Sequence, residues 1–208
     1  QLEAAYKALG QAIPKSGKEA PHEHVSAATA YMKENYYDVR MFGAVMSTGK
    51  APGDKVTGPL TVGIARSLDP VIPMELGITR TASTQEDKRD NASQMGSKTV
   101  VSYGLYAARL HYQPTRDNQV TQEDLDLLWS SVATMFEVTR SAARPSVNVR
   151  RLDLFSHESP LGNAPAVSLL DRIVVRKAEG VEQPKGFSDY TIAGPDDLPP
   201  AISHRRLV

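Results

Sequence analysis

TQEDLDLLWSSVATMFEV, residues 121–138, carries the clearest structural signal in the chain. Thr121 followed three residues later by Asp124 resembles a capping box, with aspartate in the position where glutamate is usual. Apolar residues then recur at helical spacing and form one stripe, which consists of Leu125, Leu128, Trp129, Val132, Met135 and Phe136. Because a helix with such a stripe buries it against a core, the stretch predicts an amphipathic helix over 121–138.

Outward from this helix, the hydrophobic pattern changes repeatedly between helical and extended spacing. Further helices are expected over residues 2–9, ending at Gly10, and from Val25 toward Phe42. Extended segments are expected at residues 58–73, 75–80, 98–112, 149–155 and 171–177. Helices and strands that do not alternate regularly are typical of an α+β domain.

Two further features of the pattern concern residues 58–73 and the C-terminal part of the chain. In residues 58–73, Leu60, Val62 and Ile64 alternate with other residues, which predicts a strand. From Gly180 onward the chain is rich in proline and glycine, so residues 180–208 are expected to be irregular.

Composition limits the function classes that the chain can belong to. Its 208 residues, 40% of them hydrophobic, can bury one core, so a single domain over 1–208 is expected. With 24 basic and 24 acidic residues, the chain is not a globally basic nucleic-acid binder, although a local basic stripe stays possible. The chain has no cysteine, which excludes disulfides and thiolate metal ligands. This composition, without an apolar run of about 18–20 residues, leads us to expect a cytoplasmic protein.

The segment that follows the central helix concentrates positive charge. TRSAARPSVNVRR, residues 139–151, holds four arginines and no acidic residue, and we call it the arginine loop. Guanidinium groups this close repel one another unless an anion or solvent separates them. The loop is therefore either a solvated turn between a helix and a strand or a binding site for phosphates.

Catalytic and metal-binding motifs are weakly represented. His22 and His24 are not joined by a cluster of acidic residues that would complete a metal site. His157 and Glu158 are adjacent, so on a strand they would point to opposite faces rather than form an acid–base pair. The sequence therefore favours a protein that is not an enzyme and that has neither a metal nor another cofactor.

Basic residues recur near the ends of the expected elements and in the loops between them. They are Arg40, Arg66, Arg80, Lys88, Arg89, Lys98, Arg140, Arg144, Arg150 and Arg151. Each alone is an ordinary surface charge. Together they could form a stripe whose charged groups bind phosphates, while small neighbours let the nucleic-acid backbone approach.

Six stretches, taken in order, resemble one known family. They are DVRMFGAVMSTG (38–49), GPLTVGIARSLDPVIPMELGITR (58–80), MGSKTVVSYGLY (95–106), DLDLLWSSVATMFE (124–137), TRSAARP (139–145) and SHESPLGNAPAVSLLDRIVVR (156–176). This combination resembles the CRISPR-associated backbone subunit of Cascade surveillance complexes, in its type I-C form, within the RAMP superfamily. The resemblance extends from about Leu2 to Lys177.

The resemblance implies both a fold and a role in antiviral defence. It implies an RNA-recognition-motif-like (ferredoxin-like) palm with inserted finger and thumb elements. Members of the family polymerise along a guide RNA (crRNA), bind its backbone and displace a nucleotide at regular intervals with the thumb. The guide then pairs with target DNA, so the protein does not itself read sequence. The partners implied are guide RNA, target DNA through the guide, copies of the chain, and other Cascade subunits, namely the large and the repeat-processing subunits.

Carried over to this chain, the resemblance implies a set of RNA-binding residues: Arg40, Arg80, Met95, Lys98, Arg140, Ser141 and Arg144. The thumb is expected in the polar stretch 81–97. The chain departs from the family at Pro145, where glycine is usual, since proline fixes φ and removes an amide donor. The family also begins with a palm strand upstream of the match, and that strand is expected to be missing from this sequence.

Two other functions stay open at this point. One is an RNA-processing endoribonuclease, since other RAMP proteins cut RNA, which would need a positioned acid–base group. The other is a single-stranded nucleic-acid module that acts without assembly.

Overall fold

The computed structural model describes residues 1–13, 20–47, 51–80, 94–114, 119–142 and 144–208. The helices are α1 (Leu2–Ala8), α2 (His22–Asn35), α3 (Tyr37–Phe42), α4 (Gln122–Val138) and α5 (Ala166–Leu170), with a 3₁₀ turn, η2, at Phe187–Asp189. The strands are β1 (Gly43–Ala44), β2 (Val56–Thr57), β3 (Leu60–Val62), β4 (Arg66–Ser67), β5 (Pro73–Arg80), β6 (Gln94–Val101), β7 (Tyr106–Ala107), β8 (Leu110–Tyr112), β9 (Asp153–His157), β10 (Val174–Lys177), β11 (Tyr190–Ala193) and β12 (Ile202–Arg206).

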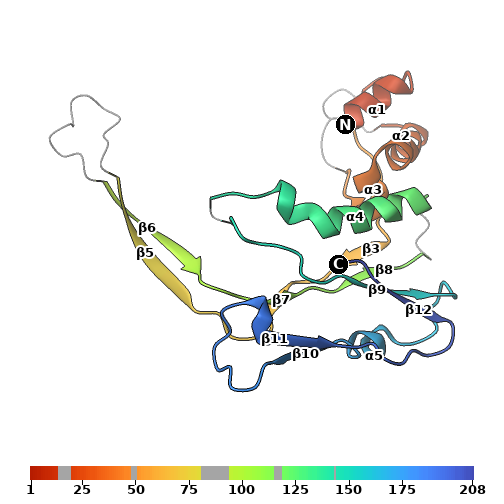
Figure 1. The fold of residues 1–208 in the computed structure, drawn as a ribbon. Coiled ribbons are helices and arrows are strands. Elements are labelled where there is room, and N and C mark those ends of the chain that lie inside the picture. Colours follow the sequence, from red (N-terminus) through yellow and green to blue (C-terminus); the bar gives the residue numbers. More distant parts are fainter. Residues whose placement is uncertain (14–19, 48–50, 81–93, 115–118, 143) are drawn as a thin grey trace, which may run out of the picture.

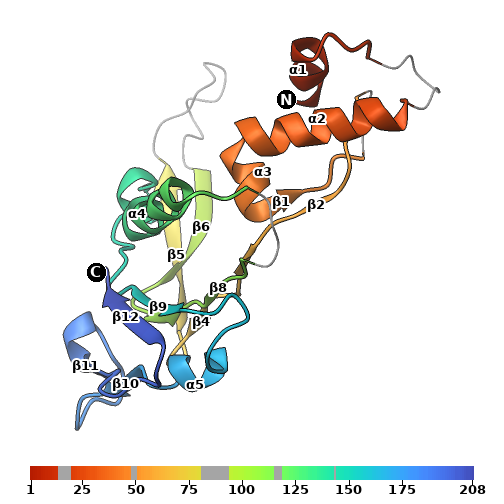
Figure 2. The same ribbon diagram turned by 90° about the vertical axis from the view of Figure 1, so that its right-hand side faces the viewer.

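The strands form antiparallel pairs that together build an elongated body. In the described part of the chain the pairs are β1–β2, β3–β8, β4–β7, β5–β6, β9–β12 and β10–β11. Helices α1–α3 lie at one end, the β5–β6 hairpin projects from the body, and α4 lies over the strands between them (Figure 1). In the view turned by 90°, α1 and α2 again lie at the end opposite β10 and β11 (Figure 2). The arrangement confirms the predicted α+β class.

The helical end has its own small core. Ala5 and Tyr6 of α1 pack on Ala28 and Met32 of α2, and all four are buried. The hydroxyl of Tyr6 donates to the carbonyl of Pro52 at 2.8 Å, which satisfies its polar atom.

The single helix predicted from Val25 toward Phe42 is in fact two helices. The chain is extended at Tyr36, where φ is −122° and ψ is 112°. Just before the break, the Asn35 amide donates to the Tyr31 carbonyl at 2.9 Å, which gives this backbone group a side-chain partner. The break turns α3 away from α2 and places it beside α4.

Helix α4 matches its prediction closely. The Thr121 hydroxyl accepts from the Asp124 amide at 3.1 Å, and the Asp124 carboxylate accepts from the Thr121 amide at 3.0 Å, so the capping box is confirmed. Leu128 is buried with Met41 and Leu60. The prediction is wrong at Met135, which is exposed, because the last turns of α4 extend beyond this core.

The single strand expected over residues 58–73 is interrupted, and only the first of its three alternating residues is buried. Leu60 is buried under α3 and α4, whereas Val62 and Ile64 are exposed. β3 ends at Val62, and the Gly63 amide donates to the Arg109 carbonyl at 2.8 Å. The core cluster therefore reaches only the beginning of the expected strand.

Two glycines allow α3 to continue directly into a tight strand crossing. Gly43 has a φ of +79°, which disfavours other residues. A Cβ atom on Gly58 would lie 2.3 Å from the carbonyl carbon of Phe42. The close approach of these two segments therefore requires glycine at both positions.

The segment from Gly180 onward is irregular only in part, since it contains the two strands β11 and β12, which were not predicted. β11 pairs with β10 from Lys177↔Tyr190 to Val174↔Ala193, and β12 pairs along the whole of β9. The prolines at 195, 199 and 200 fall between these strands rather than within them. Proline therefore interrupts no strand pairing, and the composition of the segment was misleading.

Candidate nucleic-acid interface

The β5–β6 hairpin is amphipathic. Its strands pair without a break from Pro73↔Val101 to Arg80↔Gln94. Because side chains alternate along a strand, one face carries Met74, Leu76 and Ile78 with Val100, Lys98 and Gly96 opposite them. Met74, Leu76 and Ile78 are each exposed over almost half of their surface. We call the face that these six residues share the apolar face of the hairpin, because four of them have apolar side chains, although Lys98 lies on it too. A contiguous exposed face of this kind is typical of a binding surface.

Lys98 connects this face of the hairpin to the arginine loop. Its ammonium group donates to the carbonyl of Ala142 at 3.3 Å. The two residues lie 44 positions apart in the sequence. Figure 1 shows the same relationship at the level of the chain, since the loop leaves the end of α4 that is nearest the hairpin. The structure thus brings together Lys98 and the arginine loop, two features that the resemblance implied separately.

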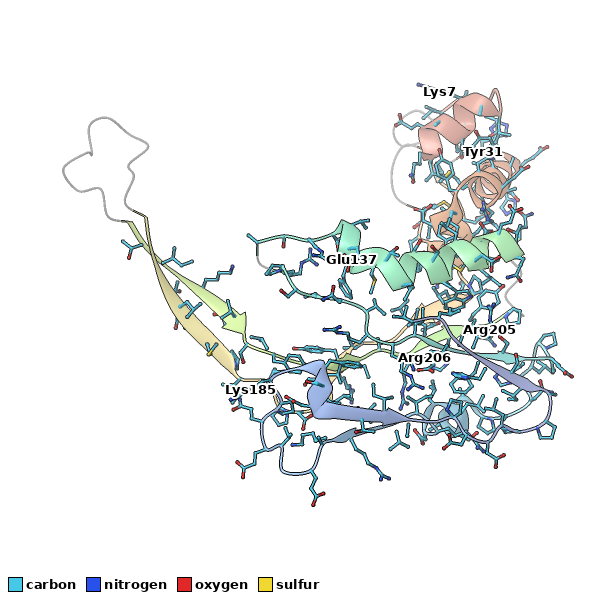
Figure 3. The ribbon with its side chains drawn as sticks, viewed as in Figure 1. Lys7, Tyr31, Glu137, Lys185, Arg205 and Arg206 are labelled. Carbon is cyan, nitrogen blue, oxygen red and sulfur yellow. The ribbon has the colours of Figure 1, made fainter. Side chains whose placement is uncertain are left out.

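The first part of the arginine loop forms a tight turn with exposed charges. The Arg144 amide donates to the Ser141 carbonyl at 2.9 Å, and these two residues form an isolated bridge. Arg140 forms an ion pair with Glu137, and both side chains are half exposed. Glu137 marks the end of α4 nearest the hairpin (Figure 3). Arg140, Ser141 and Arg144 therefore share one exposed turn at this end of the helix.

The last two arginines of the loop have structural partners. The Arg151 guanidinium is only 12% exposed and binds both carboxylate oxygens of Asp153, at 2.7 and 3.0 Å. It also donates to the carbonyl of Gly194 at 2.7 Å. Arg150 lies over the Phe187 ring, 5.3 Å from its centroid, in a cation–π contact. Two of the four arginines, Arg140 and Arg151, thus have acidic partners that lie just outside residues 139–151, namely Glu137 and Asp153.

Arg40 is more enclosed than a residue that only contacts RNA at the surface would be. Its Nε and Nη2 donate to the two carboxylate oxygens of Asp124 at 2.9 and 2.7 Å. Its Nη1 donates to the carbonyls of Lys33 and Glu34 near the end of α2. The hydrogen bond from Arg40 is the main reason that the pKa of Asp124 is lowered. The structure gives Arg40 a role in joining α2, α3 and α4, and its contact with RNA stays a prediction.

Arg80 and Met95 are placed by their backbones alone. Arg80 pairs with Gln94 at the outer end of the hairpin, and Thr79 pairs with Met95. The predicted thumb at 81–97 falls partly outside the described residues, which stop at 80 and resume at 94. Residues 94–97 belong to β6 rather than to a loop.

The apolar face of the hairpin was not predicted from the sequence. The alternation of Met74, Leu76 and Ile78 with Glu75, Gly77 and Thr79 is a strand signal with one apolar side. That signal was available, but nothing in the sequence showed that α4 and the rest of the core would leave this side uncovered.

Two other kinds of site are absent from the residues that the structure describes. No three histidine or acidic side chains in this part of the chain gather as a metal ion would require. No helix there has the length and apolar character needed to cross a membrane.

The α+β fold, the projecting hairpin and the exposed basic turn are features expected of a protein that binds an extended nucleic-acid chain. The family model described as CRISPR-associated protein Cas7 matches residues 3–194 of the 208. The chain therefore belongs to the Cas7 family, and its fold is of the RAMP type. No curated protein matches it.

Membership of this family carries a general function. Cas7 proteins are backbone subunits of CRISPR Cascade complexes, where they bind crRNA together with copies of themselves in antiviral defence. The resemblance described from the sequence motifs is thus confirmed at the level of the family.

Proposed function

We propose that this chain is the backbone subunit of a type I-C Cascade complex and that it holds crRNA between the hairpin and the arginine loop. The observation that carries the proposal is the contact between Lys98 and the Ala142 carbonyl. It joins the face of the hairpin that carries Lys98 to the turn that holds the exposed Arg140 and Arg144. An RNA backbone lying there would meet cations on one side and apolar side chains on the other.

The chemistry of these groups suits backbone recognition rather than reading of bases. Arg144 and Arg140 offer guanidinium groups that match phosphate oxygens, and each such hydrogen bond is charge-assisted. Lys98 has three donors, of which the long 3.3 Å bond to Ala142 uses one. Reading of bases needs hydrogen bonds to the base edges, which the apolar side chains of Met74, Leu76 and Ile78 cannot make. The bound guide would keep its bases available for pairing with target DNA.

The assignment to type I-C rests on the order of the sequence motifs and on the residues that they contain. TRSAARP and MGSKTVVSYGLY resemble that form, and the structure brings these two stretches into contact. Pro145 is the main departure, and it removes one amide donor at the end of the basic turn. Further partners proposed on the same basis are the large subunit and the repeat-processing subunit.

We also propose that the chain binds RNA without cutting it. Neither the hairpin, residues 73–101, nor the arginine loop contains a histidine. His157 accepts a hydrogen bond from the Asn163 amide at 2.9 Å, and His204 lies 2.8 Å from Asp153. The endoribonuclease alternative would require a positioned acid–base group, such as one of these histidines, to reach RNA. Incubation with labelled RNA should leave its length unchanged, and cleavage that disappears in His157→Ala would establish the alternative instead.

Binding of a guide-length RNA by the purified chain tests the proposal. We expect Arg144→Ala and Lys98→Ala each to weaken binding about tenfold, since a hydrogen bond to a charged group contributes roughly 1.5–3 kcal/mol. Lys7→Ala is the matched control, because Lys7 is exposed on α1 at the end of the molecule away from the hairpin (Figure 3).

Two results would contradict the proposal. One is a Lys7→Ala variant that loses as much affinity as Arg144→Ala. The other is binding that does not respond to salt, because each phosphate neutralised on a single strand should contribute a slope of about −0.7 in log K against log salt.

A further inference from the structure

Tyr190 lies where the C-terminal strands meet the base of the hairpin. Its hydroxyl donates to one carboxylate oxygen of Asp69 at 2.7 Å. Lys177, which pairs with Tyr190 across β10 and β11, places its ammonium group 3.1 Å from the other oxygen. Two residues of one strand pair therefore hold both oxygens of a single carboxylate.

The same tyrosine also contacts the segment in which the chain leaves the hairpin. Asp69 lies in the segment between β4 and β5, which leads into the hairpin. Tyr103 follows β6, where the chain leaves the hairpin, and its ring centroid lies 6.5 Å from that of Tyr190 with an interplanar angle of 31°. Tyr190 thus touches both connections between the hairpin and the body, one through its hydroxyl and one through its ring.

The protonation states of this cluster suit a lasting contact. Burial, and then the hydrogen bond to Asp69, raise the pKa of Tyr190 well above its usual range. The hydrogen bonds from Tyr190 and Lys177 lower the pKa of Asp69. A neutral hydroxyl therefore donates to an ionised carboxylate throughout the neutral pH range, which is the stronger, charge-assisted form of the bond.

The cluster lies at the base of the hairpin, where a small change alters the direction in which the hairpin projects. A two-stranded hairpin has little stability by itself, and both faces of the β5–β6 pair are largely exposed. Its direction therefore depends on what holds its base. A small rotation there moves Lys98 and the apolar face relative to the arginine loop.

We propose that Tyr190, Asp69 and Lys177 are positioning residues that set the direction in which the hairpin projects, and so align it with the arginine loop for guide binding. The inference rests on the proposed function for its second part. Its first part, the direction of the hairpin, concerns the free protein. This assigns a role to the C-terminal strands, which lie apart from the predicted RNA-binding residues.

The direction of the hairpin can be measured without RNA. Because the chain has no cysteine, Ser97→Cys on β6 and Ser130→Cys on α4 provide one pair of spin-label sites on exposed positions. Electron paramagnetic resonance then reports the distance distribution between hairpin and helix. We expect Tyr190→Phe, which removes only the hydroxyl, to broaden or shift this distribution. Lys177→Met is a second variant, and Tyr106→Phe, on the exposed strand β7, is the matched control.

RNA binding by the unlabelled variants tests the second part. We expect Tyr190→Phe to lower the affinity for guide-length RNA roughly fivefold, less than loss of a direct charged contact. It should also make the chemical reactivity of the bound nucleotides more uniform along the guide. The melting temperature of Tyr106→Phe and Tyr190→Phe is measured alongside, so that unfolding is recognised.

The outcomes separate this inference from the proposed function. Unchanged distance distributions in both Tyr190→Phe and Lys177→Met overturn it, whatever the RNA result. A changed distribution with unaltered affinity and nucleotide reactivity overturns its link to guide binding. If the unmodified chain binds no RNA, the proposed function fails, and the distance measurement still decides whether the cluster sets the direction of the hairpin.

Discussion

Arg40 and Asp124 form a two-point ion pair that joins α3 to the first turn of α4. The two nitrogen–oxygen distances are 2.9 and 2.7 Å, and the Arg40 side chain is only 15% exposed. The same Asp124 carboxylate completes the capping box with Thr121. The Asp124 side chain therefore caps the first turn of α4 and also binds α3, which belongs to the helical end of the molecule, to that turn.

Replacing Asp124 by asparagine should destabilise the protein markedly. The change keeps the shape of the side chain but leaves the Arg40 charge enclosed without its counter-ion, which costs roughly 3 kcal/mol. The free energy of unfolding from urea titration measures the loss. Glu123→Gln, in the same turn but exposed, is the control and should change stability little. Equal effects of the two changes would mean that the ion pair contributes nothing.

Stability should fall in mild acid for the same reason. The pKa of Asp124 in the folded state lies below its usual value of 3.8, chiefly because of the Arg40 hydrogen bond. A lowered folded pKa gives stability that is fully present above the unfolded pKa and is lost as the pH falls through the folded pKa. Unfolding midpoints measured between pH 7 and about pH 3 should therefore decline below about pH 5. The decline should be smaller in Asp124→Asn, and an identical profile in the two proteins would contradict this account.

Neighbouring leucines on α4 should differ strongly in their importance. Leu128 is 4% exposed and packs with Met41 and Leu60, whereas Leu127 is 52% exposed. Leu128→Ala leaves a cavity and should cost about 2–5 kcal/mol of unfolding free energy. Leu127→Ala should cost well under 1 kcal/mol, because it removes an exposed side chain from the same helix. Denaturant titration of both variants measures the difference, and similar losses would show that α4 packs by another face.

Two arginines of the arginine loop should separate stability from RNA binding. Arg151→Met removes the partner of Asp153 and should lower the unfolding free energy by roughly 3 kcal/mol, since that carboxylate is largely enclosed. Arg144→Met changes an exposed side chain and should leave stability within about 0.5 kcal/mol. RNA affinity measured on the folded proteins should show the opposite order. Loss of stability in Arg144→Met would mean that the basic turn is a structural element.

Local patterns predicted the local structure well. The capping box and the apolar stripe placed α4, because both depend on residues within one or two turns of each other. The break at Tyr36 was not predicted, since the apolar spacing continues through it. The strands β11 and β12 were missed because strand pairing with β10 and β9 stabilises segments whose own composition is that of loops.

The roles of individual arginines depended on contacts that no local pattern reports. Arg40 meets Asp124 across 84 positions of sequence, and Arg151 reaches Gly194 across 43. The four arginines of residues 139–151 looked alike in the sequence, yet one is enclosed, one lies over an aromatic ring and two share an exposed turn. The resemblance to Cascade backbone subunits supplied the function, and the fold shows which of the predicted residues lie close together.

Crosslinking of bound guide RNA tests the central claim most directly. RNA with photoreactive 4-thiouridine is bound to the purified chain, irradiated and digested, and the crosslinked peptides are identified by mass spectrometry. If the hairpin and the arginine loop hold the guide, crosslinks should concentrate in residues 73–101 and 139–151. They should weaken in Arg144→Ala but not in Lys7→Ala. Crosslinks that fall mainly in α1 and α2, with none in those two stretches, would contradict the account.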